Sequence, residues 1–518
     1  MFAAWTALLA ALDRLVMLPS LVHTVCSPPQ LPPSKHGLHN VIRACDLTMD
    51  DFLRDVQRQF EAPLHPDRLL AMSARLQTEF QKKLQHSDMC MLPSYNHTLP
   101  TGLERGTYLA LDVGGSTFRA ALVELSGKEE GANSMNIAKM RCFPINDAVR
   151  ALEGSAFFDW MAERIAETLA EPQVRAKLGQ DTLPMGLSWS FPVEQTSIRS
   201  GVLLDMGKGF RATNGVHRRD LGDLIMQACQ RRGLNVRMDA IVNDSSATLL
   251  SRAYQDDTTR LALILGTGFN ASVHLPVTAL SRQKFGARPQ EWHDQAERVL
   301  VNTELSMFGK NILPTTRWDD SLNKSHDRPD FQPFEHLISG RYLGEIVRLV
   351  LLEAVQTAGL FGGEVPERFM ERYSFDTGIM AVIEADDTPT LSKACTVLQA
   401  KHPLTAPPTY TDLYYVRQIC QLVSRRAAAY LATGIHALWA LRNNSEGLSA
   451  AEAGHVTISC NGSVIEKYPS FRTVSQQFVD ELTSLSGASA RAVDLEMAIE
   501  SSIFGAAVAV CCLEDRHS

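Results

Sequence analysis

Two glycine-rich turns, each between a pair of apolar strand-like runs, are the first candidates for chemistry. They are Asp112-Val113-Gly114-Gly115-Ser116 and Gly266-Thr267-Gly268. Glycine lets backbone N–H groups approach a phosphate with no Cβ in the way, and an acidic residue at a strand end can hold a metal ion through water. Many ordinary hairpins also turn on Gly-Gly, so either turn alone could be structural. Together, two such loops could hold one polyphosphate from opposite sides.

A carboxylate lies at the end of a third apolar run. Asp244 follows residues 240–243 and precedes the helix-like residues 247–253, which places it at the carboxyl end of a strand. There it could act as a general base that takes a proton from an attacking hydroxyl, an effect worth about 10² to 10⁴ in rate. The alternative is a structural helix N-cap.

A lysine between two glycines has to be tested as a nucleotide-binding P-loop. Five residues separate Gly201 from Gly207, and Gly209 follows Lys208 where that motif needs Ser or Thr. The spacing and the last residue both fail. We therefore interpret Lys208 as a cation of a binding cleft, and a solvated surface lysine is the alternative.

The composition is that of an ordinary globular protein. The 518 residues, 45% hydrophobic and 21% charged, are enough for two large lobes with their own cores. The net charge of -8 provides no basic surface for nucleic acid, so we expect a small-molecule partner. The ten cysteines include no CxxC pair, which favours a reducing compartment over a disulfide framework or a zinc site.

The amino-terminal segment is apolar over residues 1–18 apart from Thr6, Asp13 and Arg14, and a Pro-rich linker follows at residues 27–33. Charges in the middle argue against a membrane span, which needs about 20 apolar residues. The absence of a positive charge before the apolar run argues against a secretory signal. A helix lying in a membrane interface is one prediction, and a helix docked on the protein or a disordered leader is the other.

The remaining periodicity predicts an α/β protein. Residues 50–85 have helical spacing, and further helices are predicted at residues 157–169, 338–358 and 413–441. Strand-like runs flank both glycine turns and predict two hairpins of the same form, about 150 residues apart. Repetition of one device at this distance is what a duplicated domain would show.

Taken in order, these motifs resemble those of the eukaryotic hexokinase family, in its fungal-type form, over about residues 50–513. The first turn, with Thr117-Phe118-Arg119, is similar to the family's first phosphate motif, D-L-G-G-T-N-F-R. The other matching segments are residues 187–193 (sugar loop), Lys208-Gly209-Phe210, Val242-Asn243-Asp244-Ser245, residues 265–270 (second phosphate motif), Asn302-Thr303-Glu304 and residues 334–345.

The resemblance implies an α/β, two-lobed actin-like (ribonuclease H-like) fold with a cleft between the lobes. We divide the chain into residues 1–35 (leader and linker), 36–245 (helical preface and small lobe), 246–490 (large lobe) and 491–518 (a C-terminal helix returning to the small lobe).

It also implies a site for a hexose such as glucose, fructose or mannose. The polar residues that would bind the sugar are Ser190, Lys208, Asn243, Asp244, Asn270, Glu304 and Glu335. Carboxylates accept from hydroxyls, whereas amides and lysine donate to sugar oxygens. Asp244, together with Lys208, would be catalytic and would activate the 6-hydroxyl.

On the nucleotide side the resemblance implies ATP and Mg²⁺, with Asp112 holding the metal through water. The residues that would bind the nucleotide are Asp112, Gly114, Gly115, Ser116, Thr117, Arg119, Gly266, Thr267, Gly268, Gly462 and Ser463.

Most departures from the family pattern lie on the nucleotide side or at the junction between the two sites. Gly207 replaces a Thr before the lysine, Thr117 replaces an Asn, and the family's D-G-S-G-K-G-A-A becomes residues 500–507, Glu-Ser-Ser-Ile-Phe-Gly-Ala-Ala. Two alternatives therefore stay open: a working hexokinase, or a catalytically weak or inactive glucose-binding regulator. We expect a cytoplasmic protein whose residues 1–18 resemble the short helix that holds some hexokinases on the mitochondrial outer membrane.

Overall fold

The computed structural model describes residues 47–206 and 209–514. The predicted leader and linker, and also Gly207 and Lys208, lie outside the described residues. Within those two ranges, no helix is both long enough and apolar enough to span a membrane.

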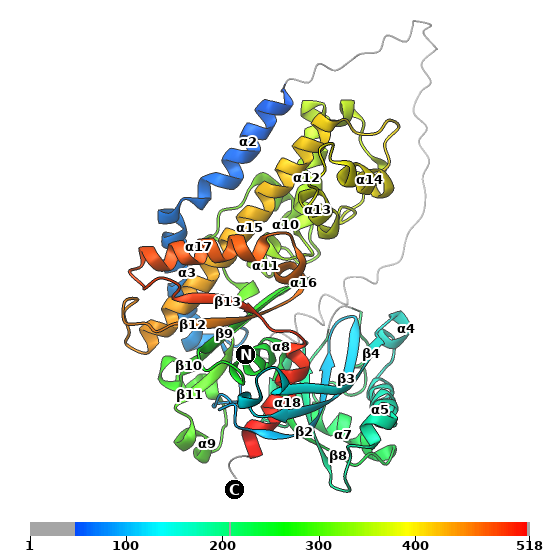
Figure 1. The fold of residues 1–518 in the computed structure, drawn as a ribbon, viewed down its shortest axis with the longest axis vertical. Coiled ribbons are helices and arrows are strands. Elements are labelled where there is room, and N and C mark those ends of the chain that lie inside the picture. Colours follow the sequence, from blue (N-terminus) through cyan, green and yellow to red (C-terminus); the bar gives the residue numbers. More distant parts are fainter. Residues whose placement is uncertain (1–46, 207–208, 515–518) are drawn as a thin grey trace, which may run out of the picture. The chain divides into compact units, whose positions relative to one another are not determined.

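The first half of the described chain builds a five-stranded sheet in the order β4-β3-β2-β5-β8 (Figure 1). The hairpin predicted at the first glycine turn is confirmed as β2 and β3, which are antiparallel. The strands are β2 (Arg105–Val113), β3 (Thr117–Ser126), β4 (Met135–Pro144), β5 (Leu183–Trp189) and β8 (Val236–Asn243). β5 pairs in parallel with β2, and β8 pairs in parallel with β5. A separate small hairpin pairs β6 (Val193–Gln195) with β7 (Gly201–Leu203).

The second half, together with the short strand β1 from the first half, builds a six-stranded sheet in the order β1-β11-β10-β9-β12-β13. Its hairpin, β9 with β10, is the one predicted at the second glycine turn. The strands are β1 (Leu92–Pro93), β9 (Thr259–Leu265), β10 (Phe269–Pro276), β11 (Arg298–Asn302), β12 (Val456–Asn461) and β13 (Val493–Met497).

The two sheets share one topology. In each, three antiparallel strands in sequence order are extended by two parallel strands on the side of the first strand: β4-β3-β2-β5-β8 matches β11-β10-β9-β12-β13. The repetition predicted from the two hairpins is thus seen in the complete strand order. The predicted α/β class is confirmed.

Helices cover both faces of the five-stranded sheet. On one face Leu109 and Leu111 pack with α5 (Ser155–Leu169) and α7 (Leu221–Arg231). On the other face Tyr108 and Ala110 pack with α8 (Asp244–Ala253) and α18 (Ser501–Glu514). This alternation follows from the period of two along a strand. Two short helices, α4 (Asp147–Arg150) and α6 (Pro172–Arg175), complete this part.

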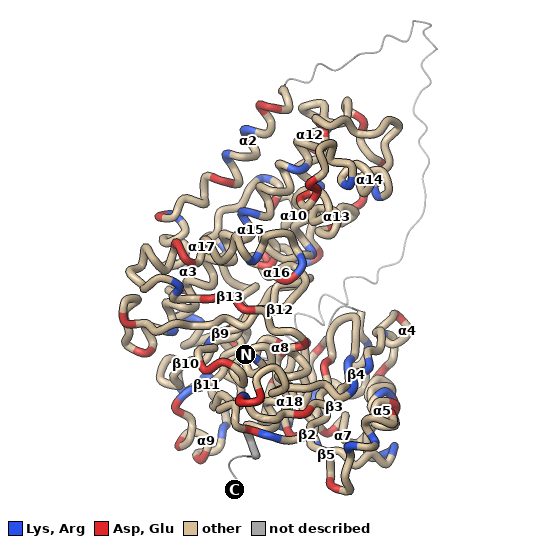
Figure 2. Tube along the Cα trace, in the orientation of Figure 1, with Lys and Arg blue, Asp and Glu red and all other residues tan. Residues whose placement is uncertain are grey.

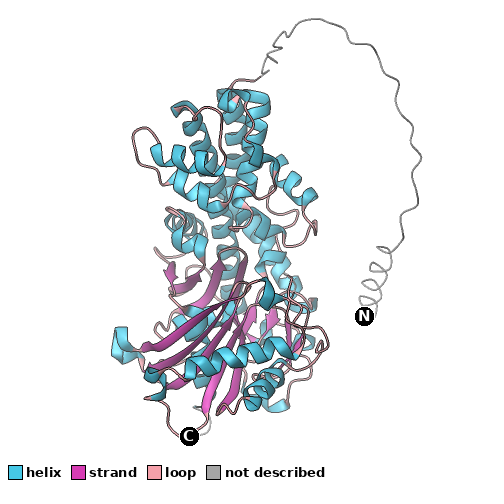
Figure 3. Cartoon of the chain, turned by 90° about the vertical axis from the view of Figure 1, so that its right-hand side faces the viewer, coloured by secondary structure: helices cyan, strands magenta, loops and turns pink. Residues whose placement is uncertain are grey.

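The largest core lies against the six-stranded sheet and contains the preface helices α2 (Met49–Glu61) and α3 (Pro66–His86). These two helices therefore pack in this core and not in that of the five-stranded sheet, although our proposed division of the chain groups them with the small lobe. Figure 3 shows the helices in cyan and the strands in magenta. The other helices of this part, labelled in Figure 1, are α9 (Gln290–Gln295), α10 (Arg317–Ser325), α11 (Pro333–Ile338), α12 (Leu343–Ala358), α13 (Thr377–Glu384), α14 (Ser392–Lys401), α15 (Tyr410–Ser445), α16 (Ser463–Lys467) and α17 (Phe471–Leu485).

One helix prediction needs correction. Residues 338–358 do not form one helix, because α11 ends at Ile338 and α12 begins at Leu343. The break is tertiary in origin: Gly340 N donates to Gly266 O at 2.8 Å, and Ser339 Oγ donates to Thr267 O at 3.0 Å. The second glycine turn takes these hydrogen bonds, so the intervening residues leave the helix.

Two helices join the two halves. α8 packs with Ala262 of β9 and Leu300 of β11 as well as with the five-stranded sheet. α18 crosses α8 and β5 at glycines: a Cβ on Gly505 would lie 1.9 Å from Ala247 O, and one on Gly186 would lie 2.0 Å from Ala506 O. Only glycine permits backbones this close. The C-terminal helix thus packs on the five-stranded sheet, although the strand before it belongs to the six-stranded one.

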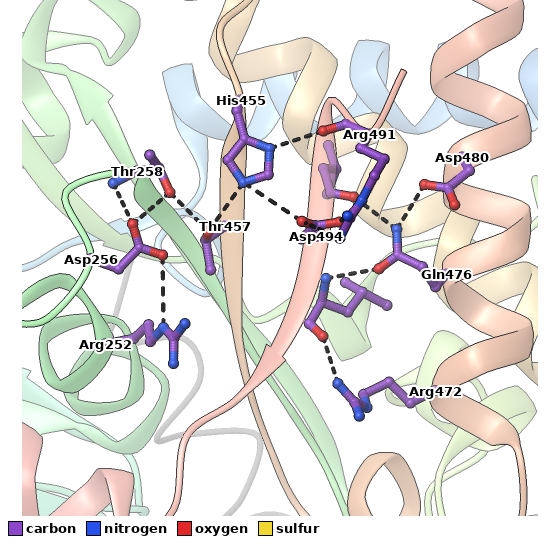
Figure 4. A network of polar contacts seen from close by, with 12 residues as sticks. Arg252, Asp256, Thr258, His455, Thr457, Arg472, Gln476, Asp480, Arg491 and Asp494 are labelled. Atoms are coloured by element: carbon purple, nitrogen blue, oxygen red, sulfur yellow. Dashed lines mark hydrogen bonds and ion pairs between the residues drawn. The ribbon is translucent and has the colours of Figure 1, made fainter. Parts of the chain in front are cut away.

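Strand β13 lies at an edge of its sheet and is held there by side chains of α17 (Figure 4). Gln476 donates to Val493 O and accepts from Leu495 N, each at 2.8 Å. Arg472 donates to Leu495 O at 2.9 Å. These bonds satisfy backbone groups that an edge strand would otherwise expose, and they fix the strand that leads to Glu500.

Charged residues of both signs are intermixed along the chain (Figure 2). Many of the arginines pair with a carboxylate, as in Arg231 with Asp159 at 2.6 Å and Arg218 with Glu194 at 2.8 Å. Exposed pairs of this kind contribute little stability, about 0 to 1 kcal/mol each.

Candidate active site

The carboxyl ends of β2, β5 and β8 lie side by side. Val113 and Asn243, the last residues of the outer two strands, both pair with Trp189 at the end of the middle strand. The next residues along the three strands are Gly114, Ser190 and Asp244. Three of the predicted site segments therefore meet at one edge of the sheet, where parallel strands commonly present functional groups.

Asp244 begins α8 directly after β8. The cap of this helix is Asn243, whose Oδ1 accepts from Ser245 N at 3.0 Å and from Ser245 Oγ at 2.7 Å. The capping role considered for Asp244 thus belongs to its neighbour. Asp244 Oδ1 accepts from Ser245 N at 2.8 Å.

A chain of amide side chains leads to Glu304. Asn270 Nδ2 donates to Asn302 Oδ1 at 2.9 Å, and Asn302 Nδ2 donates to Glu304 Oε1 at 2.9 Å. Asn270 Oδ1 in turn accepts from Ala271 N at 2.7 Å. Each amide is therefore fixed in orientation, and Glu304 is oriented by neutral hydrogen-bond partners.

Glu335 approaches the same place from α11. Its Oε2 accepts from Phe269 N at 2.8 Å. A Cβ on Gly268 would lie 2.8 Å from this oxygen, so the glycine of the second turn makes room for the carboxylate. The Gly266-Thr267-Gly268 turn thus borders a carboxylate predicted to bind the sugar.

Three carboxylates converge closely enough to interact. The pKa of Glu304 is raised from its ordinary value of 4.5 to about 7, mainly by burial and to a smaller extent by the negative charges of Asp244 and Glu335. Hydrogen bonding from Asn302 opposes this rise. The convergence joins α8, the end of β11 and α11, which are far apart in sequence.

Glu304 also has a left-handed backbone, with φ 50° and ψ 50°. This conformation costs a residue with a Cβ roughly 1 to 2 kcal/mol. Such strain persists where the surroundings fix the residue, often at functional sites.

The second glycine turn adjoins the Asn461-Gly462-Ser463 turn at the end of β12. A Cβ on Gly266 would lie 3.3 Å from Ser463 N, and Gly462 has a left-handed φ of 114°. Asn461 Nδ2 donates to Ala498 O at 2.9 Å, which ties in the end of β13. The nucleotide-side residues of the second half therefore gather at the carboxyl ends of β9, β12 and β13.

The first glycine turn is closed by backbone atoms. Gly114 N donates to Thr117 O at 3.0 Å, and Ile145 N donates to Ser116 O at 2.8 Å. Arg150 Nη2 donates to Gly115 O at 3.2 Å. Because the closing bond uses the carbonyl of Thr117, replacement of the family's Asn there leaves the closure of the turn intact.

Asp112 and Arg119 form an ion pair across this hairpin. Arg119 Nε and Nη2 donate to Asp112 Oδ2 at 2.9 and 2.7 Å, and Arg119 Nη1 donates to Glu500 Oε2 at 2.6 Å. Burial lowers the pKa of Arg119, but the charges of Asp112 and Glu500 outweigh burial and raise it above its usual value.

Comparison with known proteins agrees with this geometry. Two family models, both described as hexokinase, match residues 53–254 and 260–512. Hexokinase-7 of Oryza sativa subsp. japonica is 32% identical over 439 residues, which cover 84% of this chain and 90% of that protein. The chain belongs to the hexokinase family.

Other hexokinases are similar over comparable lengths. Hexokinase-2, chloroplastic, of Nicotiana tabacum is 33% identical over 429 residues, 82% of each chain. The solved hexokinase from Schistosoma mansoni complexed with glucose has a TM-score of 0.74 at 27% identity and covers 90% of this chain and 100% of its own. These matches confirm the predicted two-lobed actin-like fold and show that the protein is a hexose kinase.

The surroundings of Asp112 in this hexokinase are compatible with a magnesium ion that binds together with a nucleotide. Among residues 47–206 and 209–514, no group of three or more His, Cys, Asp or Glu is arranged to hold a metal by itself. Mg²⁺ bound with phosphates usually needs only one or two carboxylates and keeps its waters. Asp112 is buried, and Arg119 uses Oδ2 alone, so Oδ1 is the oxygen that would accept from a metal-bound water.

The departures of this hexokinase at residues 500–504 are accommodated by packing. Ser501 and Ile503, which replace family glycines, are fully buried. Ser501 Oγ lies 2.9 Å from Thr248 Oγ1, and Phe504, in the place of the family lysine, packs against the core between α8 and α18. The segment has become the first turn of a regular helix.

The structure adds two residues that our sequence analysis did not single out as site residues. Asn302 bridges Asn270 to Glu304, and its place in Asn302-Thr303-Glu304 was the only available signal. Glu500 binds Arg119 across 381 positions, and nothing local indicates that contact. Lys208 lies outside the described residues.

Proposed function

We propose that this hexokinase transfers the γ-phosphoryl group of ATP to the 6-hydroxyl of D-glucose and related hexoses, with Asp244 as general base. The observation that carries the proposal is the convergence of Asp244, Glu304 and Glu335 beside the second glycine turn, at the sheet edge that also carries the first. Transfer from a nucleotide to a hydroxyl needs this combination: acceptors for sugar hydroxyls, a base, and backbone donors for phosphate.

The hexose would be held by groups already oriented in the protein. Glu304 and Glu335 would accept from sugar hydroxyls, and the amides of Asn243 and Asn270, with Ser190, would complete this oriented set. Lys208, which lies outside the described residues, is proposed as a further ligand of the sugar. A hexose lacking one of these hydroxyls would leave a buried polar group unpaired, which costs about 1 to 3 kcal/mol. This is how such a site selects its substrate.

Asp244 would accept the proton of the 6-hydroxyl as that oxygen attacks the γ-phosphorus. The bond from the γ-phosphorus to the bridging oxygen breaks, and ADP leaves with the electron pair. Backbone N–H groups of residues 115–117, 267–268 and 462–463 would bind the phosphate oxygens and keep the attacking and leaving oxygens in line. Mg²⁺, held through water by Asp112, supplies positive charge to the phosphates.

One observation favours a second candidate, a weakly active or inactive glucose-binding regulator. Phe504 replaces the family lysine and packs in a core, so one cation is missing from the nucleotide side. A loss of about 3 kcal/mol in transition-state stabilisation would slow transfer about 100-fold and leave sugar binding intact.

A coupled assay of hexose 6-phosphate formation separates the two candidates. We expect the protein to phosphorylate glucose, fructose or mannose with Mg·ATP, and Asp244→Ala to lower kcat by about 10² to 10⁴. Asp387→Asn, which removes an exposed carboxylate paired with Lys393, is the control and should leave activity unchanged. An intact protein without activity, whose melting temperature still rises with glucose, would support the regulator.

We also propose a cytoplasmic location, with residues 1–18 held peripherally on the mitochondrial outer membrane. The support is the apolar composition of this segment. Fusion of residues 1–35 to a fluorescent protein tests the idea, and we expect a mitochondrial rim. A diffuse cytosolic signal would refute the membrane association.

A further inference from the structure

We infer that Glu500 is a positioning residue of the nucleotide side. It acts through Arg119 to orient Asp112 and to make the net charge of the three groups negative. This inference rests on the proposed function, because it concerns how the protein would hold the metal of Mg·ATP. Glu500 occupies the place of the first Asp in the family's D-G-S-G-K-G-A-A segment, and its carboxylate reaches the first phosphate motif from the other end of the chain.

The contacts form a three-membered series. The Glu500 carboxylate accepts from Arg119 Nη1 at 2.6 Å, and Arg119 uses Nε and Nη2 for Asp112. The guanidinium is a planar fork, so its orientation toward one carboxylate fixes its orientation toward the other. All three side chains are at least partly buried, with exposed fractions of 7% for Asp112, 27% for Arg119 and 32% for Glu500.

The backbone at Glu500 is committed to this arrangement. Glu500 has a left-handed φ of 50°, although a residue with a Cβ is disfavoured there. Its carbonyl accepts from Ile503 N and Phe504 N at 3.0 Å each, so it stands at the start of α18. An acidic side chain at a helix start ordinarily caps the helix or favours its dipole, but this one bonds to a strand of the five-stranded sheet.

The contact between Glu500 and Arg119 also lies where the chain passes from one sheet to the other. Glu500 lies between β13, an edge strand of the six-stranded sheet, and α18, which packs on the five-stranded sheet. The ion pair with Arg119 on β3 therefore spans the connection between the two halves.

Charge explains why a second carboxylate matters. Asp112 with Arg119 alone is a neutral pair and a poor attractor of a dication. Adding Glu500 gives the three groups a net charge of -1, because two carboxylates share one guanidinium. Residues behind a metal carboxylate commonly change metal affinity by about 10- to 100-fold when they are replaced.

The test is binding of a nonhydrolysable Mg·ATP analogue to the glucose-loaded protein, measured by calorimetry. We expect Glu500→Gln to weaken this binding about tenfold, and to raise by a similar factor the Mg²⁺ concentration needed for half-maximal activity. Glucose affinity and the melting temperature should stay at wild-type values. Glu500→Asp keeps the charge, and we expect it to stay within about threefold of wild type in Mg·nucleotide binding.

Asp159→Asn is the matched control, because it removes one carboxylate from an Arg–Asp pair of the same length on the outer helices α5 and α7. Wild-type Mg·nucleotide binding by Glu500→Gln would overturn the inference and leave the proposed function standing. An unmodified protein that binds glucose but no Mg·nucleotide would overturn both. Equal weakening by Glu500→Gln and Asp159→Asn would show a general effect of charge and would also overturn the inference.

Discussion

The carboxylates of the proposed sugar side and of the proposed nucleotide side have opposite electrostatic surroundings. Glu304 is oriented by a neutral amide chain through Asn302 and Asn270, and the pKa of Glu304 rises to about 7 because burial and neighbouring negative charges are not offset by a cation. Asp112 and Glu500 share the guanidinium of Arg119 instead.

The difference fits the two ligands. A hexose is neutral, so its site can orient acceptors with amides and tolerate repulsion among carboxylates. A nucleotide arrives with phosphates and a dication, so its site needs a fixed balance of charges. The departures from the family pattern in residues 500–504 lie on the proposed nucleotide side.

The largest effect should come from Gly505→Ala, which tests whether residues 500–507 are a packing element against α8. The added Cβ would lie 1.9 Å from the backbone oxygen of Ala247, which cannot move without shifting α8. We expect a loss of about 3 kcal/mol in stability, seen as a lower melting temperature. Gly454→Ala is the control, because a Cβ there meets nothing within 4 Å. Equal melting temperatures would show that the segment is not a packing element.

Gly268→Ala should displace Glu335, a residue of the proposed sugar side. Its Cβ would lie 2.8 Å from Glu335 Oε2 and displace the carboxylate from Phe269 N. We expect glucose affinity to fall about 10- to 100-fold, because a hydrogen bond to a charged group is worth about 1.5 to 3 kcal/mol. Calorimetric titration with glucose measures this. In Gly266→Ala the nearest atom is Ser463 N at 3.3 Å, and an equal loss of glucose affinity there would contradict the assignment.

Glu304→Gln should remove a pH dependence of glucose binding. Below pH 7 the wild-type carboxyl is protonated and accepts hydrogen bonds less well, so affinity should rise up to about tenfold from pH 6 to 8. The glutamine variant should bind weakly, with a flat pH profile. Titrations at several pH values decide this, and a profile that keeps its slope in the variant would assign the titration to another group.

Glu304→Gln weakens glucose binding, but it should raise the stability of the sugar-free protein at high pH. Because the pKa of Glu304 is raised in the folded protein, the contribution of this group to stability is present below about pH 4.5 and is lost as the pH rises through about 7. The loss is on the order of 3 kcal/mol. Without sugar, Glu304→Gln should therefore melt higher than wild type at pH 8 and equally at pH 4.5. Glu364→Gln, at an exposed carboxylate that accepts from Thr405, should show no such gain.

The smallest effect should come from Phe504→Lys, which restores the family residue. A lysine here adds a point charge that attracts phosphate, and we expect the KM for ATP to fall about threefold with glucose affinity unchanged. The partly buried ring that is lost packs against the core between α8 and α18, so the melting temperature should also fall slightly. A higher KM would show that the phenylalanine itself contributes to nucleotide binding.

Local patterns were sufficient for the elements that depend on neighbouring residues. Both hairpins, the class and several helices, among them α5 and α15, follow from periods of two and 3.6 and from turn residues. The pairing of Asp112 with Arg119 could also have been inferred, because the register of the first hairpin places these two residues opposite each other. The cap of α8 could not be assigned between Asn243 and Asp244, because either side chain can serve at a helix start.

By itself, the sequence determined the two glycine turns, the strand ends that carry Asp112 and Asp244, and the family resemblance that linked distant motifs. Only the tertiary structure decided that α11 ends at Ile338, because the bonds that interrupt it come from Gly266 and Thr267. It alone decided that Glu304 is flanked by Asp244 and Glu335 and that Glu500 meets Arg119. The physical reason is common to all three: the energies involved arise between groups brought together from separate elements, and no local pattern of residue types records which groups will meet.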